Sequence, residues 1–562
     1  MSDSPGTFSS PYLPSRTQME AVIAGLRQYA PPSDKHAEYL RAEIHTAKSE
    51  LPRYDAEITA VKAMLERLAC EREWFRTYNE ACESAFSPAR RLPPEVLLHI
   101  FSFAAKVRYH SHAAVHEQYC LHAIARVCTQ WRTLLLETSH LWRDIYADLT
   151  HTFDMNAAMA PLAQNLRWGR PSALAPISFN LKFNIDNEAG RFALGLLAQH
   201  AESWRSASIT VRGTGFFGEE LNCAKGKLGN LESLEILSHQ DLHDLDVFTE
   251  APKLTHVAFS NTPPLLPWHQ IQAVTCKPLS EPNSLLPLLQ FLDHCPPTCN
   301  VTLPNLSIAY LYRWREEAPA APTVQSAIRS LRLGLSYYDL EEDESDLVTE
   351  VILADFFDYL DLPELRALSI NADMNRETAW KQPIVFPDEA FLAFASRSSN
   401  ISSLFLHDIR ISPEQLIAAL GQLPALERLF FQDLVLFGEW DEEGFEYNYP
   451  PHHVALTNEV LQHLTDASVV APHLIDLRVA ALFDDVSHPT LVGCIRSRTE
   501  RAGCRNSIFG LQITTLQRAY YPTDYRKNEL ADLLQPLVDG GGLKLTFIPK
   551  YELKVSEFVS EL

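Results

Sequence analysis

The chain has 562 residues and a formal net charge of -23, from 48 Lys and Arg against 71 Asp and Glu. At about one domain per 150 residues, this length predicts several domains, and the acidic balance argues against a surface that neutralises nucleic-acid phosphates. Hydrophobic residues make up 46% of the chain and aromatic residues 10%, as in ordinary packed proteins, so a wholly disordered chain is excluded.

The sequence lacks signs of secretion or membrane insertion. Its start has no basic segment followed by an apolar core, and no apolar run reaches the roughly 18 residues that span a bilayer. Ten cysteines are scattered along the chain, which is typical of reduced intracellular proteins rather than disulfide scaffolds. We therefore expect a soluble intracellular protein, cytoplasmic or nuclear, without membrane or nucleic-acid partners.

A disordered tail and a helical arm are expected first. Residues 1–33 are rich in Ser, Pro and Thr, which favours an unpacked tail. Residues 34–86 repeat apolar side chains every seven residues in two offset sets, as in a coiled coil, with a break or kink expected near Leu51 because of Pro52. The arm would either associate with itself or a partner helix, or fold back as a hairpin. The two sets are Ile44, Leu51, Ile58 and Leu65, and Leu40, Ala47, Tyr54, Val61, Leu68, Phe75 and Cys82.

Residues 88–148 contain short amphipathic helices. Pro93 and Pro94 favour a helix start, and the apolar surface that follows exceeds what so small a bundle can bury within itself, so a partner surface is expected. From 91 to about 146 the segment resembles the F-box. The matching residues are Leu92-Pro93-Pro94-Glu95-Val96-Leu97, Ile100-Phe101, Arg126-Val127-Cys128, Trp131-Arg132 and Leu141-Trp142.

This resemblance implies a three-helix module that docks the Skp adaptor of cullin-RING ubiquitin ligases. In the family, the Leu-Pro opening and the hydrophobic residues after it touch the adaptor, whereas the later positions divide between core and adaptor contact. A small helical bundle without an adaptor is the alternative. The implied adaptor-binding residues are Leu92, Pro93, Val96, Leu97, Ile100, Phe101, Val127, Cys128, Trp131, Leu141 and Trp142.

The loop between Phe103 and Leu121 is longer than in many F-boxes and resembles that of mushroom-type fungal F-box proteins. It contains His110, His112, His116 and Cys120, a spacing that can bind Zn²⁺. Because a clear fourth ligand and a paired knuckle are lacking, we interpret it as a solvated His-rich loop and expect no metal.

Residues 149–562 repeat a phrase in which an apolar residue is followed three and five positions later by two more. Two spacings, 23 and 25 residues, fall in the window of leucine-rich repeats, whereas 36 and 48 are longer. In one copy, Ser412 and Pro413 predict a helix start and Gly421 its end. The copies are Leu231-Leu234-Ile236, Leu254-Val257-Phe259, Ile328-Leu331-Leu333, Leu365-Leu368-Ile370, Ile401-Leu404-Leu406, Leu426-Leu429-Phe431, Leu474-Leu477-Val479 and Ile508-Leu511-Ile513.

These phrases resemble a degenerate leucine-rich repeat array. The resulting fold class is α/β: a helical arm and a three-helix F-box, then an irregular leucine-rich repeat solenoid. Such a solenoid presents a curved strand face, so we expect it to bind a protein target. An Ig-like or other β-rich fold is disfavoured because helices alternate with the strand phrases.

Two acidic stretches, 339–346 and 438–453, interrupt the array, and charge runs of this kind are usually solvated loops. The second also contains aromatic residues, which are common anchors in recognition surfaces and here would favour a basic partner. The candidate substrate-binding residues are Trp440, Phe445, Tyr447 and Tyr449.

Signals for catalysis are weak. Gly213, Gly215 and Gly218 match a dinucleotide-binding spacing, but the helix that should follow is interrupted by further glycines, so we interpret them as a turn and expect no cofactor. The sequence predicts a non-enzymatic substrate-recognition subunit of a Skp-cullin-F-box ubiquitin ligase. The alternative is a leucine-rich repeat scaffold that the helical arm oligomerises, without a ubiquitin role.

Overall fold

A computed structural model of the chain shows a mixed α/β protein that divides into two units, residues 1–99 and residues 100–562. The structure describes residues 13–27, 31–106, 119–151, 155–169, 175–213, 215–260, 262–277, 289–307, 324–336, 353–354, 356–373, 384–432, 455–466, 470–481, 486–504, 508–515 and 524–547. Within these ranges, every helix is too short or too polar to cross a membrane.

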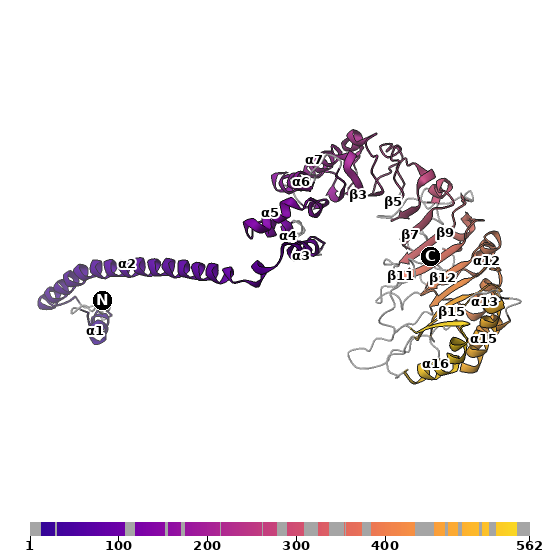
Figure 1. Ribbon diagram of the computed structural model, residues 1–562. Helices are drawn as coiled ribbons and strands as arrows, with labels where there is room; N and C mark the ends of the chain where they lie inside the picture. Colours follow the sequence, from indigo (N-terminus) through magenta and orange to yellow (C-terminus); the bar gives the residue numbers. More distant parts are fainter. Residues whose placement is uncertain are drawn as a thin grey trace. The chain divides into compact units, whose positions relative to one another are not determined.

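The first unit is dominated by one long helix, α2 (Asp34–Ala85), which has no buried residue (Figure 1). The helix continues through Pro52, so of the predicted break or kink near Leu51 the break is wrong. A proline removes one backbone hydrogen bond, and the many remaining bonds of a helix of 52 residues hold it together. Within the predicted tail, α1 (Arg16–Leu26) forms a short exposed helix with a capping box between Ser15 and Gln18.

Short helices precede the large sheet. A 3₁₀ turn, η1 (Pro88–Arg91), leads into α3 (Pro94–Lys106). Two further helices follow, α4 (Tyr119–Ile124) and α5 (Thr129–Glu137). The resemblance implied a three-helix module, but the residues after α5 form only a 3₁₀ turn, η3 (Ser139–Trp142). Strand β1 follows this turn.

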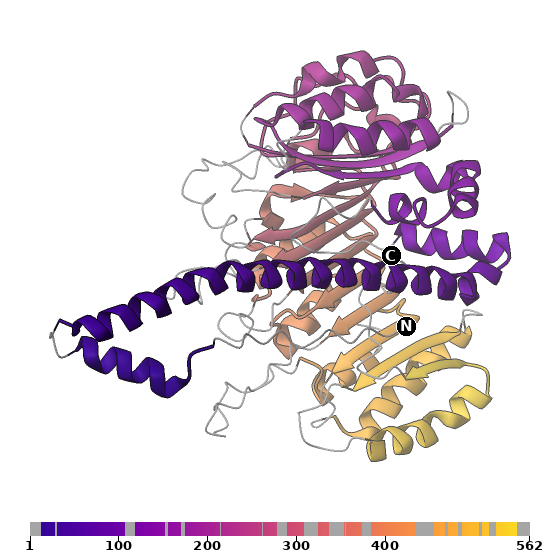
Figure 2. The same cartoon turned by 90° about the vertical axis from the view of Figure 1, so that its left-hand side faces the viewer.

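Fourteen described strands form one parallel sheet in which they follow one another in chain order (Figures 1 and 2). They are β1 (Asp144–Asp148), β2 (Ile177–Asn184), β3 (Trp204–Arg212), β4 (Ser233–Ser238), β5 (His256–Phe259), β6 (Ala273–Cys276), β7 (Asn300–Ser307), β9 (Ser330–Ser336), β11 (Ala367–Asp373), β12 (Ser403–His407), β13 (Arg428–Gln432), β14 (Asp476–Ala481), β15 (Phe509–Thr515) and β16 (Leu543–Phe547). A separate two-stranded pair joins β8 (Val324–Gln325) and β10 (Leu360–Asp361).

Helices occur in many of the connections between strands and line the outer side of the curved sheet (Figure 1). The α-helices are α6 (Met155–Gly169), α7 (Glu188–Ala198), α8 (Gly218–Leu221), α12 (Asp388–Arg397), α13 (Pro413–Gly421), α14 (Asn458–Thr465), α15 (His488–Cys504) and α16 (Asp524–Asp539). Short 3₁₀ turns are η4 (Ala201–Ser203), η5 (Asn222–Ala224), η6 (Trp268–Gln270) and η7 (Phe291–His294). The helix predicted from Ser412 to Gly421 is confirmed, with the Ser412 side chain accepting from the Gln415 N–H.

In all eight apolar phrases, the last two residues lie on a strand and the first lies just before it, and the phrases are aligned across the sheet. Leu404 in β12, for example, pairs in register with Leu368 of β11 and Leu429 of β13. These side chains are buried in one continuous core against the helices. The exception is Ile508, which is exposed because Phe509 takes the core position instead.

Strands without leucine-rich phrases were missed by the sequence pattern. Ile271, Val274 and Cys276 occupy the same buried positions in β6 as the predicted apolar residues do elsewhere. Strand β1, inside the segment assigned to the F-box, pairs with β2 and is the first strand of the sheet. The residues of β1 therefore belong both to the segment assigned to the F-box and to the sheet.

The buried side chain of Arg498 connects α15 to the end of α14 and to the segment before β14. Arg498 of α15 donates from Nε to the Leu464 carbonyl at 2.7 Å, from Nη2 to the Val470 carbonyl at 2.8 Å and from Nη1 to the Ala471 carbonyl at 2.5 Å. Burial lowers the pKa of Arg498 to about 10, so it remains a cation at neutral pH. Its three bonds satisfy carbonyls where α14 ends and the chain turns toward β14.

Replacing Arg498 with Met should destabilise this end of the sheet. The substitution keeps an apolar stem but leaves three carbonyls without their donor, which we expect to cost on the order of 3 kcal/mol. Urea unfolding should shift to lower concentration, and amide exchange in α14 and β14 should accelerate. Arg501→Met, at an exposed position one turn along α15, is the matched control. Equal protection in both variants would refute this role.

Candidate functional site

The apolar residues of α3 lie on two sides of the helix, one buried and one exposed. The Pro93 carbonyl accepts from the N–H groups of Val96 and Leu97, both at 3.1 Å, which fixes the first turn. Leu97 and Phe101, four residues apart, are buried. On the other side, three side chains lie in the solvent: Val96 is 43%, Ile100 45% and Phe103 61% exposed. Phe103 was not among the sequence-predicted residues, although it continues the same stripe.

The later predicted residues divide in the same way. Cys128 caps α5, its Sγ accepting from the Trp131 N–H at 3.4 Å, and the Trp131 ring packs edge-on against Phe101 with centroids 5.2 Å apart. Val127 is exposed beside this cap, whereas Leu141 and Trp142 are buried. Leu92, Cys128 and Trp131 are partly buried, and Pro93 is exposed.

Trp142 joins the helical segment to the sheet-bearing part of the chain. Its indole N–H donates to the Leu135 carbonyl of α5 at 2.8 Å, and its ring meets Trp168 of α6 edge-on at 4.7 Å. His122 of α4 lies against both tryptophans, at 5.3 Å from Trp142 and 5.6 Å from Trp168. Burial lowers the pKa of His122, so its neutral ring belongs to this aromatic cluster.

The comparison with known families bears on this segment. Residues 89–148 match the F-box-like family model. The chain thus carries an F-box-like domain, and such domains generally bind Skp-type adaptors. Its matched residues run to the end of β1, so the domain includes the first strand of the sheet. No curated protein matches the chain.

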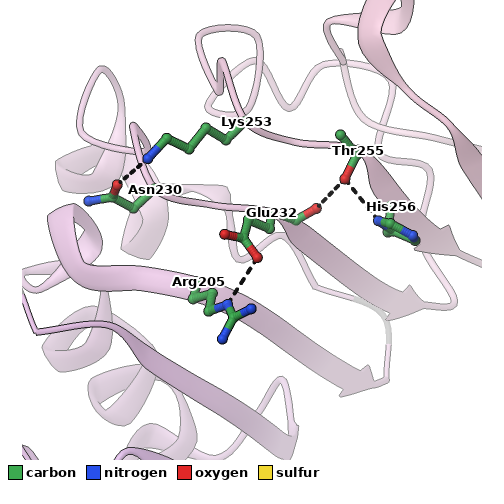
Figure 3. Close-up of polar contacts among 6 residues, drawn as sticks. All are labelled: Arg205, Asn230, Glu232, Lys253, Thr255 and His256. Atoms are coloured by element: carbon green, nitrogen blue, oxygen red, sulfur yellow. Dashed lines mark hydrogen bonds and ion pairs between the residues drawn. The ribbon is translucent and has the colours of Figure 1, made fainter.

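The beginnings of strands β3 to β5 carry a polar ladder (Figure 3). Arg205 pairs with Glu232 at 2.9 Å, and Lys253 Nζ donates to Asn230 Oδ1 at 2.9 Å. The Thr255 hydroxyl bonds the Glu232 carbonyl at 3.3 Å. Because these pairs are exposed, each contributes little to stability. They mark a polar rim rather than a buried site.

The sheet face opposite the core has a polar network at its N-terminal end. The Asn180 amide donates to Ser208 Oγ at 3.0 Å, and that hydroxyl donates to Glu235 Oε2 at 2.7 Å. Lys277 Nζ donates to the other Glu235 oxygen at 2.6 Å. Burial alone would raise the pKa of Glu235, but the bonds from Lys277 and Ser208 outweigh it and hold the pKa below its usual range. These bonds link side chains of three strands and of the residue after β6, while Asn180 Oδ1 has no hydrogen-bond partner among the described residues.

Farther along the same face lies Arg332, which has no acidic partner among the described residues. Arg332 of β9 aligns with Ser369, Phe405 and Phe430 on the next three strands. The two phenylalanines stack with centroids 4.2 Å apart and are buried on this face. Burial lowers the pKa of Arg332, and within the described residues its Nε has no acceptor. The sequence signal was available, because Arg332 lies between the core residues Leu331 and Leu333.

Several predicted site features fall outside the described residues. These are the aromatic candidates Trp440, Phe445, Tyr447 and Tyr449, the acidic stretch 339–346, and His110, His112 and His116. Among the residues that are described, three or more His, Cys, Asp or Glu side chains do not gather as a metal site would require.

Backbone conformation and close packing explain why glycines occur after β3. Gly213 has a φ of 93°, in the left-handed region that favours glycine. A Cβ built on Gly215 would come within 2.6 Å of the Ile185 side chain. The helix that follows, α8, has only four residues, and β3 pairs directly with β4. Gly213 and Gly215 therefore lie where the chain leaves β3 and passes close to Ile185, and α8 and η5 follow before β4.

The buried His122 makes the F-box-like domain sensitive to acid. Unfolded histidine titrates near 6.5, and the folded pKa is lower, so between these values the unfolded state binds more protons and acidification destabilises the fold. We expect the wild-type thermal midpoint to fall as the pH drops through 6.5. His122→Gln should flatten this decline, whereas His140→Gln, at an exposed position, should leave it unchanged. Identical pH profiles for the wild type and His122→Gln would contradict this.

Proposed function

We propose that the chain is the substrate-recognition subunit of a Skp-cullin-F-box ubiquitin ligase, without catalytic activity of its own. The F-box-like match at residues 89–148 carries this proposal. The domain docks the Skp adaptor, and the parallel sheet, as a degenerate leucine-rich repeat solenoid, holds a protein target. Holding the target near the ligase raises the local concentration of its lysines. The long loop after Phe103 supports a place among mushroom-type fungal F-box proteins.

The adaptor contact is proposed for the exposed side of α3 and its neighbourhood. Exposed apolar side chains are carried here by Val96, Ile100, Phe103 and Val127. A contiguous exposed apolar patch of this kind commonly marks a protein-protein interaction site. Pro93 and the partly buried Leu92 flank this stripe. The buried members of the predicted set are not proposed to touch the adaptor. They are Leu97, Phe101, Leu141 and Trp142.

The target contact is proposed for the sheet face that carries Arg332. A cation held partly out of water without a counter-charge gains most from an anionic group, so a carboxylate on the target is the natural complement. The acidic stretches would favour basic residues elsewhere on the same target. Together these features fit a target with mixed charge rather than a uniformly basic one.

A leucine-rich repeat scaffold oligomerised by the helical arm, without a ubiquitin role, is the second candidate. The exposed apolar side chains of α2 favour it. The two candidates differ in one property, because only the ligase subunit requires adaptor binding through the F-box-like domain.

Charge placed on the exposed α3 stripe should abolish adaptor binding. In the full-length double variant Val96→Glu and Ile100→Glu, two buried anions would oppose the apolar contact, and we expect affinity for the purified Skp adaptor to fall at least 100-fold. Leu92→Ala with Pro93→Ala should also weaken binding. Isothermal titration calorimetry measures both.

The control is Phe192→Glu, which charges an exposed apolar residue of α7. It should bind the adaptor as the wild type does. Circular dichroism should show unchanged folding in all variants. Wild-type protein that fails to bind the adaptor, or stripe variants that bind it normally, would refute the proposed function.

Removing the unpaired cation should weaken target capture and leave adaptor binding intact. Arg332→Gln keeps a polar side chain but loses the charge, so we expect at least a tenfold reduction in the recovery of captured target. Quantitative affinity capture with mass spectrometry measures this. The control is Arg205→Gln on the polar rim. Equal recovery with both variants would exclude Arg332 from the target contact.

A further inference from the structure

The long helix α2 carries an apolar stripe whose side chains are not buried. None of its residues is buried, and Ile44, Leu51, Ile58 and Leu65 are 50–67% exposed. Because the helix runs unbroken from Asp34 to Ala85, the seven-residue repeat keeps one register along its whole length. These four residues take position a of a heptad, and Tyr54, Val61, Leu68, Phe75 and Cys82 take position d.

With this register, Pro52 falls at position b, away from the stripe. Its ring and its missing N–H therefore affect the solvent side of the helix and leave the a and d positions free to pack.

The charges that flank the stripe differ on its two sides. Glutamates occupy position g four times, and bases occupy position e four times. The glutamates are Glu43, Glu50, Glu57 and Glu71, and the bases are Arg41, Lys48, Lys62 and Arg76. In a parallel pair of helices, each g side chain faces the e side chain five residues later on its partner. In an antiparallel pair, g faces g and e faces e.

The parallel arrangement therefore makes this charge pattern complementary to itself. Glu43 would face Lys48, Glu57 would face Lys62 and Glu71 would face Arg76 of the second copy. One like-charged pair arises, Glu50 with Asp55, and Arg53 lies 3.7 Å from Glu50 and offsets its charge. An antiparallel pair would instead place acids against acids and bases against bases, which costs energy along the entire length.

Two polar a positions help to fix the alignment. Arg72 and Asn79 interrupt the apolar series, and an asparagine at position a favours a two-stranded, in-register pair because its amide can bond the same amide of the partner. We propose that α2 pairs with α2 of a second copy of this chain to form a parallel, in-register, two-stranded coiled coil.

The orientation has a consequence for the F-box-like domain. α2 ends at Ala85 and the next turn begins at Pro88, so a parallel pair brings both copies of residue 88 to the same end of the coiled coil. A dimer would present two docking segments from one end and could bind its partners bivalently. This inference does not depend on adaptor binding and is tested without the adaptor.

The first test measures the mass of the full-length protein by light scattering. We expect twice 63.5 kDa for the wild type. Ile58→Asp with Leu65→Asp, both in the stripe, should give 63.5 kDa. Ala56→Asp with Ala63→Asp adds the same charges at position f of the same helix and should remain dimeric. A monomeric wild type, a trimer, or a stripe variant that stays dimeric would overturn the proposal.

The second test determines the orientation by thiol cross-linking. Cys82 at position d would meet Cys82 of the partner only in a parallel, in-register pair, whereas Cys70 lies at position f, outside the stripe. A short bis-maleimide should cross-link the wild type and Cys70→Ser into dimers but not Cys82→Ser. A dimer that is not cross-linked through Cys82 would exclude the parallel arrangement.

Discussion

Everything in the C-terminal part depends on the register of the parallel strands. Apolar residues at alternating positions meet their equivalents on the next strand, so a single core continues from Ile145 in β1 to Leu543 in β16. The same alternation forces every intervening residue onto the opposite face. Arg332 and the network around Glu235 therefore face away from the core because the core residues alternate with them, and the proposed target contact follows from this packing.

Trp142 extends this constraint to the F-box-like domain. Because the tryptophan bonds Leu135 and packs on Trp168, the last turn of the domain is part of the same buried structure as α6. Strand β1 then follows directly and pairs with β2. The end of the F-box-like domain and the first strands of the sheet are thus joined by packing.

The sequence predicted the repeated strands because leucine at positions one, four and six is a strong signal of a core-facing phrase. It missed β6, where Cys276 completes the phrase, because cysteine is rarely counted as a repeat residue although it packs as a small hydrophobe. The continuation of α2 through Pro52 was also missed. Helix propensity scores each residue by itself and does not count the hydrogen-bonded turns on both sides of the proline, which hold the helix together.

Which side chains are buried and which are exposed was harder to predict than the positions of the strands. Sequence resemblance grouped Val96 with Leu97, and only the three-dimensional arrangement separates the exposed residue from the buried one. The same applies to Trp142, whose partner Trp168 lies beyond the resemblance. Arg332 was visible as a charge inside a strand phrase, but whether its Nε finds an acceptor among the described residues depends on which side chains the neighbouring strands bring beside it.

The central claim is that one chain holds the adaptor and the target at the same time. The most direct measurement immobilises the purified Skp adaptor and adds a target identified by affinity capture, with and without the full-length protein. The account predicts that the adaptor retains the target only when the protein is present. Retention of the protein without the target, or no retention of the protein at all, would contradict it.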